Sequence, residues 1–290
     1  MTYRQALKQG EALLEEKQVP DAGTDAWYLL EYTLKSAGEK RADRTWYFLH
    51  ESEEIPKERL TAYQELLEQR GRRIPLQHLT GEQEFMGIPF LVNEQVLIPR
   101  QDTETLVEES LRILRPGMEV LDVCTGSGCI IISLAKLKEG IAASASDLSE
   151  EALETAREND RRQQTGVRFF RGDLFEAVEG TYDVIVSNPP YIPTQTIETL
   201  MEEVRLYEPR LALDGREDGL YFYRRLAAES RNYLKPGGHL LLEIGADQGE
   251  DVKNLLKQAG FCNVSVKKDL AGRDRVAAGE RPTAGGKKDV

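Results

Sequence analysis

The chain has 290 residues, of which 40% are hydrophobic, and its formal net charge is −12 at pH 7. This length favours one large and one small domain, and the hydrophobic content is ample for a core. The negative charge argues against a dedicated nucleic-acid-binding protein, because such proteins need basic surface to pair with phosphates, although it leaves room for a local basic patch.

The start of the chain and its cysteine usage favour a cytoplasmic protein. Met1–Gln5 leads into an amphipathic helix and not into an apolar signal segment, and no stretch approaches the length of a transmembrane span. The three cysteines and three histidines are Cys124, Cys129, Cys262, His50, His78 and His239. Because no Cys-x-x-Cys pair is present and the histidines are dispersed, we expect a reducing compartment, no disulfide framework and no metal site.

Residues 1–73 have the pattern of a small all-helical domain. An apolar stripe over residues 7–14 predicts the first helix. Thr24-Asp25 is expected to cap a second helix, which stops near Gly38. A later leucine-rich stretch predicts one more helix. The sequence of this domain fits two roles equally well: a domain that only stabilises the rest of the protein, or a domain that recognises the substrate.

Residues 74–100 change character and predict a β-hairpin linker. Glu84–Asn93 contains two short apolar runs, and the chain is expected to turn near Gly87-Ile88. Beyond the linker, Asp102-Thr103-Glu104 begins a helix, and carboxylates in a first helical turn suit the helix macrodipole. Helix capping is therefore the expected role of Asp102 and Glu104.

Residues 101–280 form the larger predicted domain, in which strand and helix alternate. This pattern predicts an α/β fold with a mostly parallel sheet and helices on both faces. The predicted strands cover residues 118–123, 142–146, 167–170, 182–186 and 240–244, with two closing strands at 264–267 and 275–278. Pro236-Gly237-Gly238 is expected to lead into the fifth strand. The tail from Gly279, which includes residues 281–290, is expected to be disordered.

A glycine loop follows the first of these strands. It comprises Cys124, Thr125, Gly126, Ser127 and Gly128. Small residues let a ligand approach the backbone, while N–H groups at the start of the next helix face the ligand's anionic group. Ile131 stands where a dinucleotide-binding loop has its third glycine, and no Gly-Lys-Ser/Thr follows. NAD, FAD and P-loop nucleotides are therefore disfavoured.

Two carboxylates follow later strands at the same edge of the predicted sheet. Asp147 ends the second strand, the position of a carboxylate that pairs with ribose hydroxyls. Asp173 follows the third strand and can accept a hydrogen bond from an adenine amine, with Leu174 packing on the ring. Either aspartate alone would be interpreted as an ordinary helix cap, but their places at successive strand ends predict a nucleoside-containing cofactor.

Asn188, Pro189, Pro190 and Tyr191 follow the fourth strand, where open α/β sheets bind their ligands. The prolines lack N–H groups, so with the Asn188 side-chain oxygen they offer acceptors, and Tyr191 adds a flat face. Such a site can accept both hydrogens of an –NH2 group and aim its nitrogen at an electrophile. The motif resembles that of amino-methyltransferases, which methylate planar amines on adenine, cytosine or glutamine with S-adenosylmethionine. The cofactor-binding residues expected on this basis are Asn188, Asp147, Asp173, Leu174 and the glycine loop.

Motifs on both sides of this core extend the resemblance. They are Leu79–Glu82, Glu84-Phe85, Leu97–Arg100, Asp102–Glu104, Tyr207–Arg210, Asp218-Gly219, Pro236–Gly238, Glu243–Gly245 and Asp269–Arg275. With them, the chain from about residue 75 to 278 resembles the bacterial peptide chain release factor glutamine N5-methyltransferases, the PrmC/HemK family. The resemblance implies a class I, Rossmann-like methyltransferase domain that uses S-adenosylmethionine. It also implies that the helical domain before it recognises the substrate.

The resemblance further implies the reaction. In this family the methyl group goes to the side-chain amide of the glutamine in the Gly-Gly-Gln motif of class 1 release factors, which leaves S-adenosylhomocysteine. Asn188–Tyr191 would then grip that amide as catalytic and substrate-binding residues. Two positions depart from the family pattern: Cys124 stands where the family often has glycine, and Gln101 stands where it often has proline.

Two other functions compete with this interpretation. An N6-adenine or N4-cytosine methyltransferase would share Asn188–Tyr191, but it would also need a basic channel and a means of extruding the base. A protein that binds S-adenosylmethionine or a release factor without catalysis would have no need for the amide grip. We therefore expect a class 1 release factor as partner, no stable nucleic-acid complex, no membrane attachment and a monomer.

Overall fold

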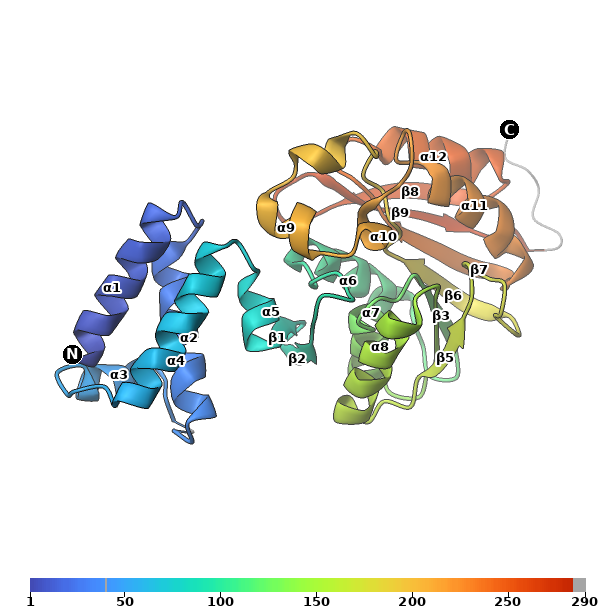
Figure 1. Ribbon diagram of the computed structural model, residues 1–290. Coiled ribbons are helices and arrows are strands. Elements are labelled where there is room, and N and C mark those ends of the chain that lie inside the picture. The colour runs from blue at the N-terminus through green and yellow to red at the C-terminus, as the bar shows by residue number, and fades with distance from the viewer. Residues whose placement is uncertain (40, 284–290) are drawn as a thin grey trace. The chain divides into compact units, whose positions relative to one another are not determined.

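A computed structural model describes residues 1–39 and 41–283 and divides the chain into two compact units (Figure 1). The first, here called the helical unit, contains Met1–Gly81 together with Met201–Tyr207. The second, the sheet unit, contains Glu82–Leu200 and the chain from Glu208 onward. In the described part of the chain, no helix combines the length and the apolar character needed to cross a membrane. The predicted tail residues 284–290 lie outside the described residues.

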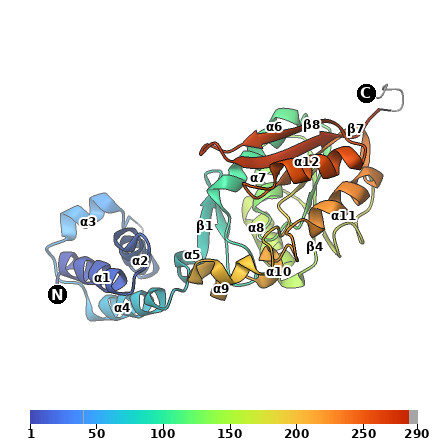
Figure 2. The same cartoon turned by 90° about the horizontal axis from the view of Figure 1, so that it is seen from above.

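The helical unit surrounds one apolar core, and Figure 2 shows its first four helices as a group. Its helices are α1 (Tyr3–Glu16), α2 (Ala22–Ser36), α3 (Arg44–His50), α4 (Lys57–Gly71), α5 (Leu76–Thr80) and α9 (Glu202–Tyr207). Leu14, Leu30 and Tyr63 are fully buried in the core. The predicted cap at Thr24-Asp25 was wrong. Helix α2 begins at Ala22, so both residues lie inside its first turn.

Asp25 instead belongs to a buried ionic network. Nε of Arg70 donates to Asp25 Oδ2 at 2.7 Å, and Nη2 of the same guanidinium donates to Glu203 Oε1 at 3.0 Å. Arg73 Nη2 donates to the other Glu203 oxygen at 2.7 Å. Arg70 is only 5% exposed, so its charge depends on these carboxylates. The network binds α9 into the helical unit although Glu203 is 133 positions from Arg70 in the sequence.

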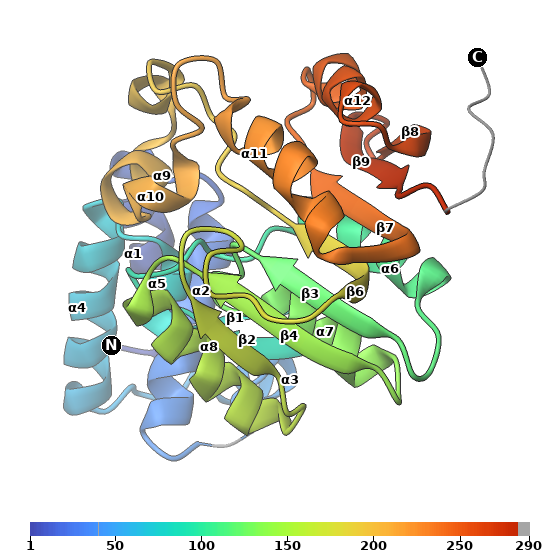
Figure 3. The ribbon, with the colours of Figure 1, turned by 90° about the vertical axis from the view of Figure 1, so that its right-hand side faces the viewer.

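The sheet unit contains a seven-stranded sheet with strand order β5-β4-β3-β6-β7-β9-β8 (Figure 3). The strands are β3 (Glu119–Val123), β4 (Ala142–Asp147), β5 (Arg168–Arg171), β6 (Tyr182–Ser187), β7 (Leu234–Glu243), β8 (Cys262–Lys268) and β9 (Asp274–Glu280). Strands β3 to β7 run parallel, whereas β9 pairs antiparallel with both β7 and β8. The predicted α/β fold with a mostly parallel sheet is confirmed.

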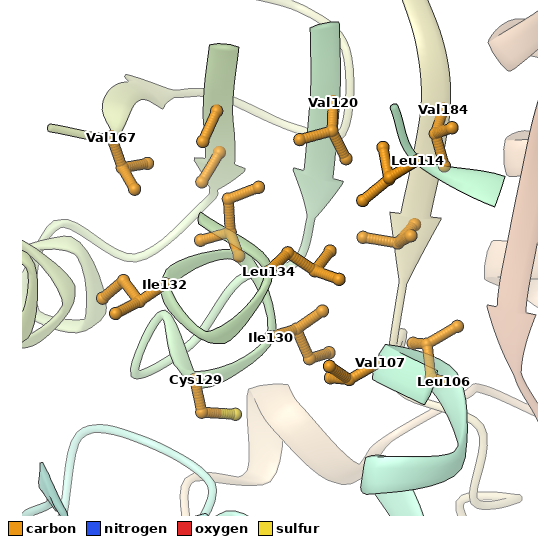
Figure 4. Close-up of a cluster of buried hydrophobic side chains, with 14 of the residues drawn as sticks. Leu106, Val107, Leu114, Val120, Cys129, Ile130, Ile132, Leu134, Val167 and Val184 are labelled. Carbon is orange, nitrogen blue, oxygen red and sulfur yellow. The ribbon is translucent and has the colours of Figure 1, made fainter. Parts of the chain in front are cut away.

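Helices cover both faces of this sheet. The helices of this unit are α6 (Glu104–Ile113), α7 (Cys129–Leu137), α8 (Glu150–Gln163), α10 (Arg210–Leu213), α11 (Tyr221–Glu229) and α12 (Gly249–Gln258), with short 3-10 turns at Gln101–Thr103, Thr196–Thr199 and Ser230–Asn232. Of these, α10 lines the cavity described below and covers neither face. Val120 of β3 and Val184 of β6 pack with Ile130 and Leu134 of α7, as Figure 4 shows. Leu121, the next residue of β3, packs in a second core with residues of α11 and α12. The side chains of successive strand residues thus pack on opposite faces of the sheet.

Three local boundaries differ from the sequence-based expectation. The predicted hairpin forms from β1 (Glu82–Phe85) and β2 (Ile88–Leu91), but its turn is Met86-Gly87. Both turn residues have positive φ, 54° and 72°, which matches the twist of a two-residue hairpin turn. Pro236–Gly238 lies inside β7 and not before it. Gly279 was wrongly placed in a disordered tail, because β9 pairs with β7 as far as Glu280.

Replacing Arg70 with methionine is expected to lower the free energy of unfolding of the helical unit by about 3–5 kcal/mol, because Asp25 would be left buried without its cation and Glu203 would keep only Arg73. Trp27 and Trp46 are the only two tryptophans and both lie in this unit, so tryptophan fluorescence during urea unfolding reports on it selectively.

Lys35→Met is the matched control, since Lys35 forms an exposed pair with Glu31 on α2 and should cost about 0.5 kcal/mol or less. Equal, small losses for Arg70→Met and Lys35→Met would contradict a stabilising role for the buried network.

Candidate functional site

The parallel strands end at one cavity of about 340 Å³. Strand register brings Cys124 after β3, Asp147 at the end of β4 and Asn188 after β6 to the same edge of the sheet. The predicted site residues that line the cavity are Cys124, Thr125, Gly126, Ser127, Asp147, Asp173, Leu174, Asn188 and Pro190. Gly128, Pro189 and Tyr191 lie outside this lining. The structure therefore brings most of the predicted cofactor residues together with Asn188 and Pro190 at a single cavity.

The glycine loop has left-handed backbone conformations at three positions. Gly126 and Gly128 have φ of 55° and 79°, and Cys124 has φ of 63°. A side chain at Gly128 would collide with Ile132, whose Cδ1 atom would lie 2.8 Å from its Cβ. At Gly126, by contrast, a Cβ would meet no atom within 4 Å. The loop is thus closed against the helix at Gly128 and open at Gly126, where a ligand can approach the backbone.

Asp147 ties the end of β4 to the glycine loop. Its Oδ2 accepts from the Gly126 N–H at 2.8 Å, and its Oδ1 accepts from the Ser149 N–H at 3.0 Å. Burial raises the pKa of Asp147, and these backbone hydrogen bonds oppose that shift by stabilising the carboxylate. Each oxygen keeps a further lone pair, so Asp147 can still accept hydrogen bonds from ligand hydroxyls.

Asp173 has a partner that the sequence reasoning missed. Nη1 of Arg225, from α11, lies 2.9 and 2.8 Å from the two carboxylate oxygens of Asp173. The ion pair positions Asp173 at the cavity and occupies part of its capacity to accept hydrogen bonds. The neighbouring Leu174 is buried, and its backbone C=O accepts from the hydroxyl of Ser146 at 2.9 Å. No local pattern marked Arg225, because it lies 52 positions from Asp173.

The Asn188–Tyr191 segment is packed tightly from behind. A Cβ at Gly219 would lie 2.4 Å from the Tyr191 backbone oxygen, and one at Gly215 would lie 2.8 Å from the Tyr191 carbonyl carbon. Gln248 Nε2 donates to the same Tyr191 oxygen at 3.0 Å. The Tyr191 hydroxyl is directed to Glu243, at 3.5 Å. This packing makes the segment a rigid support for Asn188. In the sequence, only the Asp218-Gly219 motif indicated this close packing.

Buried carboxylates behind the cavity were also missed. Asp122, inside β3, is fully buried, accepts from the Thr125 hydroxyl at 2.7 Å, and has its pKa raised to about 7 by burial. Burial also raises the pKa of Glu243 to about 7 and raises the pKa of Glu208. Glu208 accepts from the guanidinium of Arg100, which lines the cavity. Asp122 could have been found from the sequence, because it is a charged residue within an otherwise apolar predicted strand. Glu208 and Glu243 occur in the sequence motifs named above, but the motifs assigned them no role.

The residues around the cavity fit a ligand that carries a nucleoside. Asp147 and Asp173 provide acceptors for hydroxyl and amine groups. The space at Gly126 admits a ligand close to the backbone. Over residues 1–39 and 41–283, no group of three or more His, Cys, Asp or Glu side chains could hold a metal ion.

Both parts of the chain resemble known proteins. A family model described as the PrmC N-terminal domain matches residues 5–81, and one described as the methyltransferase small domain matches residues 102–207. A protein from Geobacter sulfurreducens named release factor glutamine methyltransferase is 41% identical over 279 residues, which cover 96% of each chain. A relative of the same name from Clostridium acetobutylicum is 38% identical and covers 97% of this chain and 99% of its own.

The fold also matches a solved structure. A methyltransferase from Pyrococcus furiosus has a TM-score of 0.52 and 23% identity, with 68% of this chain and 91% of that chain covered. At this identity the likeness concerns the fold alone.

Substitutions of Cys124 test the strained loop. Cys124→Gly should change the free energy of unfolding by about 1 kcal/mol or less, since relief of left-handed strain offsets the greater freedom of glycine in the unfolded chain. Cys124→Val should lower it by at least about 2 kcal/mol, because a β-branched side chain is poorly tolerated at positive φ.

Both changes are measured by chemical unfolding. Cys262→Val is the control, because Cys262 begins strand β8, where a β-branched residue is well accommodated. A Cys124→Val protein as stable as the Cys262→Val protein would mean that the loop does not hold position 124 in this conformation.

Proposed function

Because the chain belongs to the family of release factor glutamine methyltransferases, we propose that it methylates the side-chain amide nitrogen (N5) of the glutamine in the Gly-Gly-Gln motif of class 1 peptide chain release factors. The observation that carries the proposal is the position of Asn188. It stands in the cavity after β6, with its side-chain nitrogen directed to Thr103 and its oxygen left for another donor. The methyl donor is S-adenosylmethionine and the product is S-adenosylhomocysteine.

The cofactor would be held by the glycine loop and the strand-end carboxylates. Asp147 would accept from the ribose hydroxyls, while Asp173 and Leu174 would meet the adenine ring. Arg225 fixes the position of Asp173 for that role. When bound, S-adenosylmethionine supplies a methyl group on a sulfonium that is already a good electrophile.

The protein's part in the reaction is to position the amide. Asn188 Oδ1 and the Pro189 carbonyl would each accept one hydrogen of the glutamine –NH2 group, which aims the nitrogen along the line of attack. Amide nitrogens are poor nucleophiles, and alignment of this kind can supply several kcal/mol. The amide becomes acidic only as the new bond forms, so its proton can leave late to water and no strong base is required.

The helical unit is the proposed recognition site for the release factor. The match of residues 5–81 to the PrmC N-terminal domain supports this assignment, as do the relatives that match over nearly their whole length. The sequence boundaries 1–73 for this domain, 74–100 for the linker and 101–280 for the methyltransferase domain remain our working division. The helical unit also includes α9, so deletion of residues 1–73 would remove the partners of Glu203.

Asp147→Ala is expected to weaken S-adenosylmethionine binding by about tenfold or more, because charge-assisted hydrogen bonds are worth about 1.5–3 kcal/mol. Isothermal titration calorimetry measures the effect. Asp251→Ala, an exposed change on α12, should bind like the wild type. Unchanged affinity in a folded Asp147→Ala protein would remove Asp147 from the cofactor site.

Asn188→Ala is expected to lower turnover on the order of 100-fold, because the amide can then rotate away from the line of attack. Cofactor affinity should change much less. Asn188→Asp keeps an acceptor oxygen and should retain more activity than Asn188→Ala.

The assay is methyl incorporation into a purified class 1 release factor, with mass spectrometry locating the methyl group. Asn254→Ala, exposed on α12, serves as the control. A methyl group found on adenine or cytosine of added nucleic acid, or near-normal turnover by Asn188→Ala, would overturn the proposed function.

A further inference from the structure

The Gln248 side chain joins three loops of the sheet unit. Gln248 lies between β7 and α12 and is 8% exposed. Its Nε2 donates to the Tyr191 backbone oxygen at 3.0 Å and to the Gly219 backbone oxygen at 3.4 Å. Its Oε1 accepts from the Gly245 N–H at 2.9 Å. One buried amide thus connects the loop after β6, the loop before α11 and the loop after β7.

The backbone groups around Gln248 fix the orientation of its amide. A backbone N–H can only donate a hydrogen bond, and a backbone C=O can only accept one. The amide nitrogen of Gln248 must therefore face Tyr191 and Gly219, while its oxygen faces Gly245. Glutamine supplies both a donor and an acceptor at this distance from the backbone, whereas methionine has no donor and an ionised glutamate has only acceptors.

Two glycines leave the space that this amide occupies. A Cβ at Gly219 would lie 2.8 Å from Gln248 Nε2, and a Cβ at Gly245 would lie 2.8 Å from Gln248 Oε1. Both distances are too short for a side-chain carbon. Gly219 and Gly245 end the sequence motifs Asp218-Gly219 and Glu243–Gly245, to which the reaction itself assigns no role. The structure gives both glycines the same use, which is to admit Gln248.

The carbonyl that Gln248 holds ends the Asn188–Tyr191 segment, which lies between two anchored residues. Before the segment, the Ser187 hydroxyl donates to Val123 O at 2.6 Å. After it, the Ile192 N–H donates to Leu213 O at 3.0 Å. The residues on both sides of the segment are therefore held, and the orientation of its last peptide group decides where its carbonyls point.

Pro189 and Pro190 make the segment sensitive to that peptide group. Their rings fix φ at both positions, which leaves few torsions that could absorb a rotation at Tyr191. A buried carbonyl without a donor is unfavourable, so loss of the Gln248 hydrogen bond favours such a rotation. The Pro189 carbonyl, which is proposed to accept a hydrogen of the substrate amide, would then move with it.

We propose that Gln248 is a positioning residue for methyl transfer: by holding the Tyr191 carbonyl, it fixes the Asn188–Tyr191 segment in the form that grips the substrate amide. The inference rests on the proposed function. Gln248 lies outside the lining of the cavity, so it acts through the segment and not by contact with substrate or cofactor. Its loss should therefore slow methyl transfer more than it weakens binding.

Gln248→Met and Gln248→Glu test this role, because both keep the length of the side chain and lose its N–H donors. Each should lower kcat for release factor methylation about 10- to 100-fold, counted per cofactor-binding site. The KM for release factor and the dissociation constant of S-adenosylmethionine should each change by about threefold or less. A role in packing alone predicts near-normal kcat in both variants, and that result would overturn the proposal. Failure of both variants to fold would also overturn it, since Gln248 would then be required for folding.

Gln163→Met is the matched control. Gln163, on α8, also uses its Nε2 to donate to a backbone oxygen, that of Pro89, at 3.1 Å. The same substitution at this position should leave kcat unaltered. A loss of kcat in Gln163→Met equal to that in Gln248→Met would show that removal of any such amide impairs the enzyme, and would sink the proposal.

Hydrogen exchange followed by mass spectrometry measures the positioning without turnover. The Ile192 N–H should exchange about tenfold faster in Gln248→Met than in the wild type, and by a larger factor than the N–H groups of β3. Unchanged exchange at Ile192 would mean that the segment does not depend on Gln248. The same factor at Ile192 and in β3 would mean a general loss of stability. Either result would contradict the positioning role.

The wild-type reaction distinguishes this inference from the function on which it rests. If wild-type protein leaves the Gly-Gly-Gln glutamine unmethylated, the proposed function fails. If the wild type methylates that glutamine and Gln248→Met has the same kcat, the function stands and only the positioning role fails.

Discussion

The register of the parallel strands is the constraint on which the rest of the site depends. Val123 of β3 is aligned with Ser146 of β4 and with Ser187 of β6, and Ser187 is aligned with Leu242 of β7. The next residue in each strand or loop is therefore Cys124, Asp147, Asn188 or Glu243. A slip of one residue would exchange the two faces of a strand and bury the wrong side chains, so the apolar cores on both faces maintain this alignment.

Close backbone packing then converts aligned strand ends into a defined cavity. Gly128 lies against Ile132, and Gly215 and Gly219 lie against Tyr191, at distances that leave no room for a side chain. Gly215 and Gly219 contact the Tyr191 main chain directly, and the Gln248 side chain holds the same carbonyl. Such support suits a reaction that depends on alignment more than on acid–base chemistry.

Electrostatics differs between the two units. In the helical unit, Arg70 pairs with carboxylates that burial would otherwise leave uncompensated, and this pairing holds a distant segment of the chain. In the sheet unit, Asp122 and Glu243 have raised pKa values because burial outweighs the groups that favour their charge. Asp122 accepts from the Thr125 hydroxyl at the cavity, and Glu243 faces the Tyr191 hydroxyl.

The sequence by itself determined the features that depend on local pattern: the alternation of strands and helices, the glycine loop, and the Asn188–Tyr191 motif after a strand, from which we propose amide binding. Each of these depends on the properties of consecutive residues, such as periodicity, absent N–H groups or small side chains. Only the tertiary structure decided that Asp25 pairs with Arg70 and does not cap a helix, that α9 belongs to the helical unit, and that Arg225 pairs with Asp173. These outcomes depend on contacts between residues far apart in the chain and on the cost of burying a charge, for which one sequence carries no local signal.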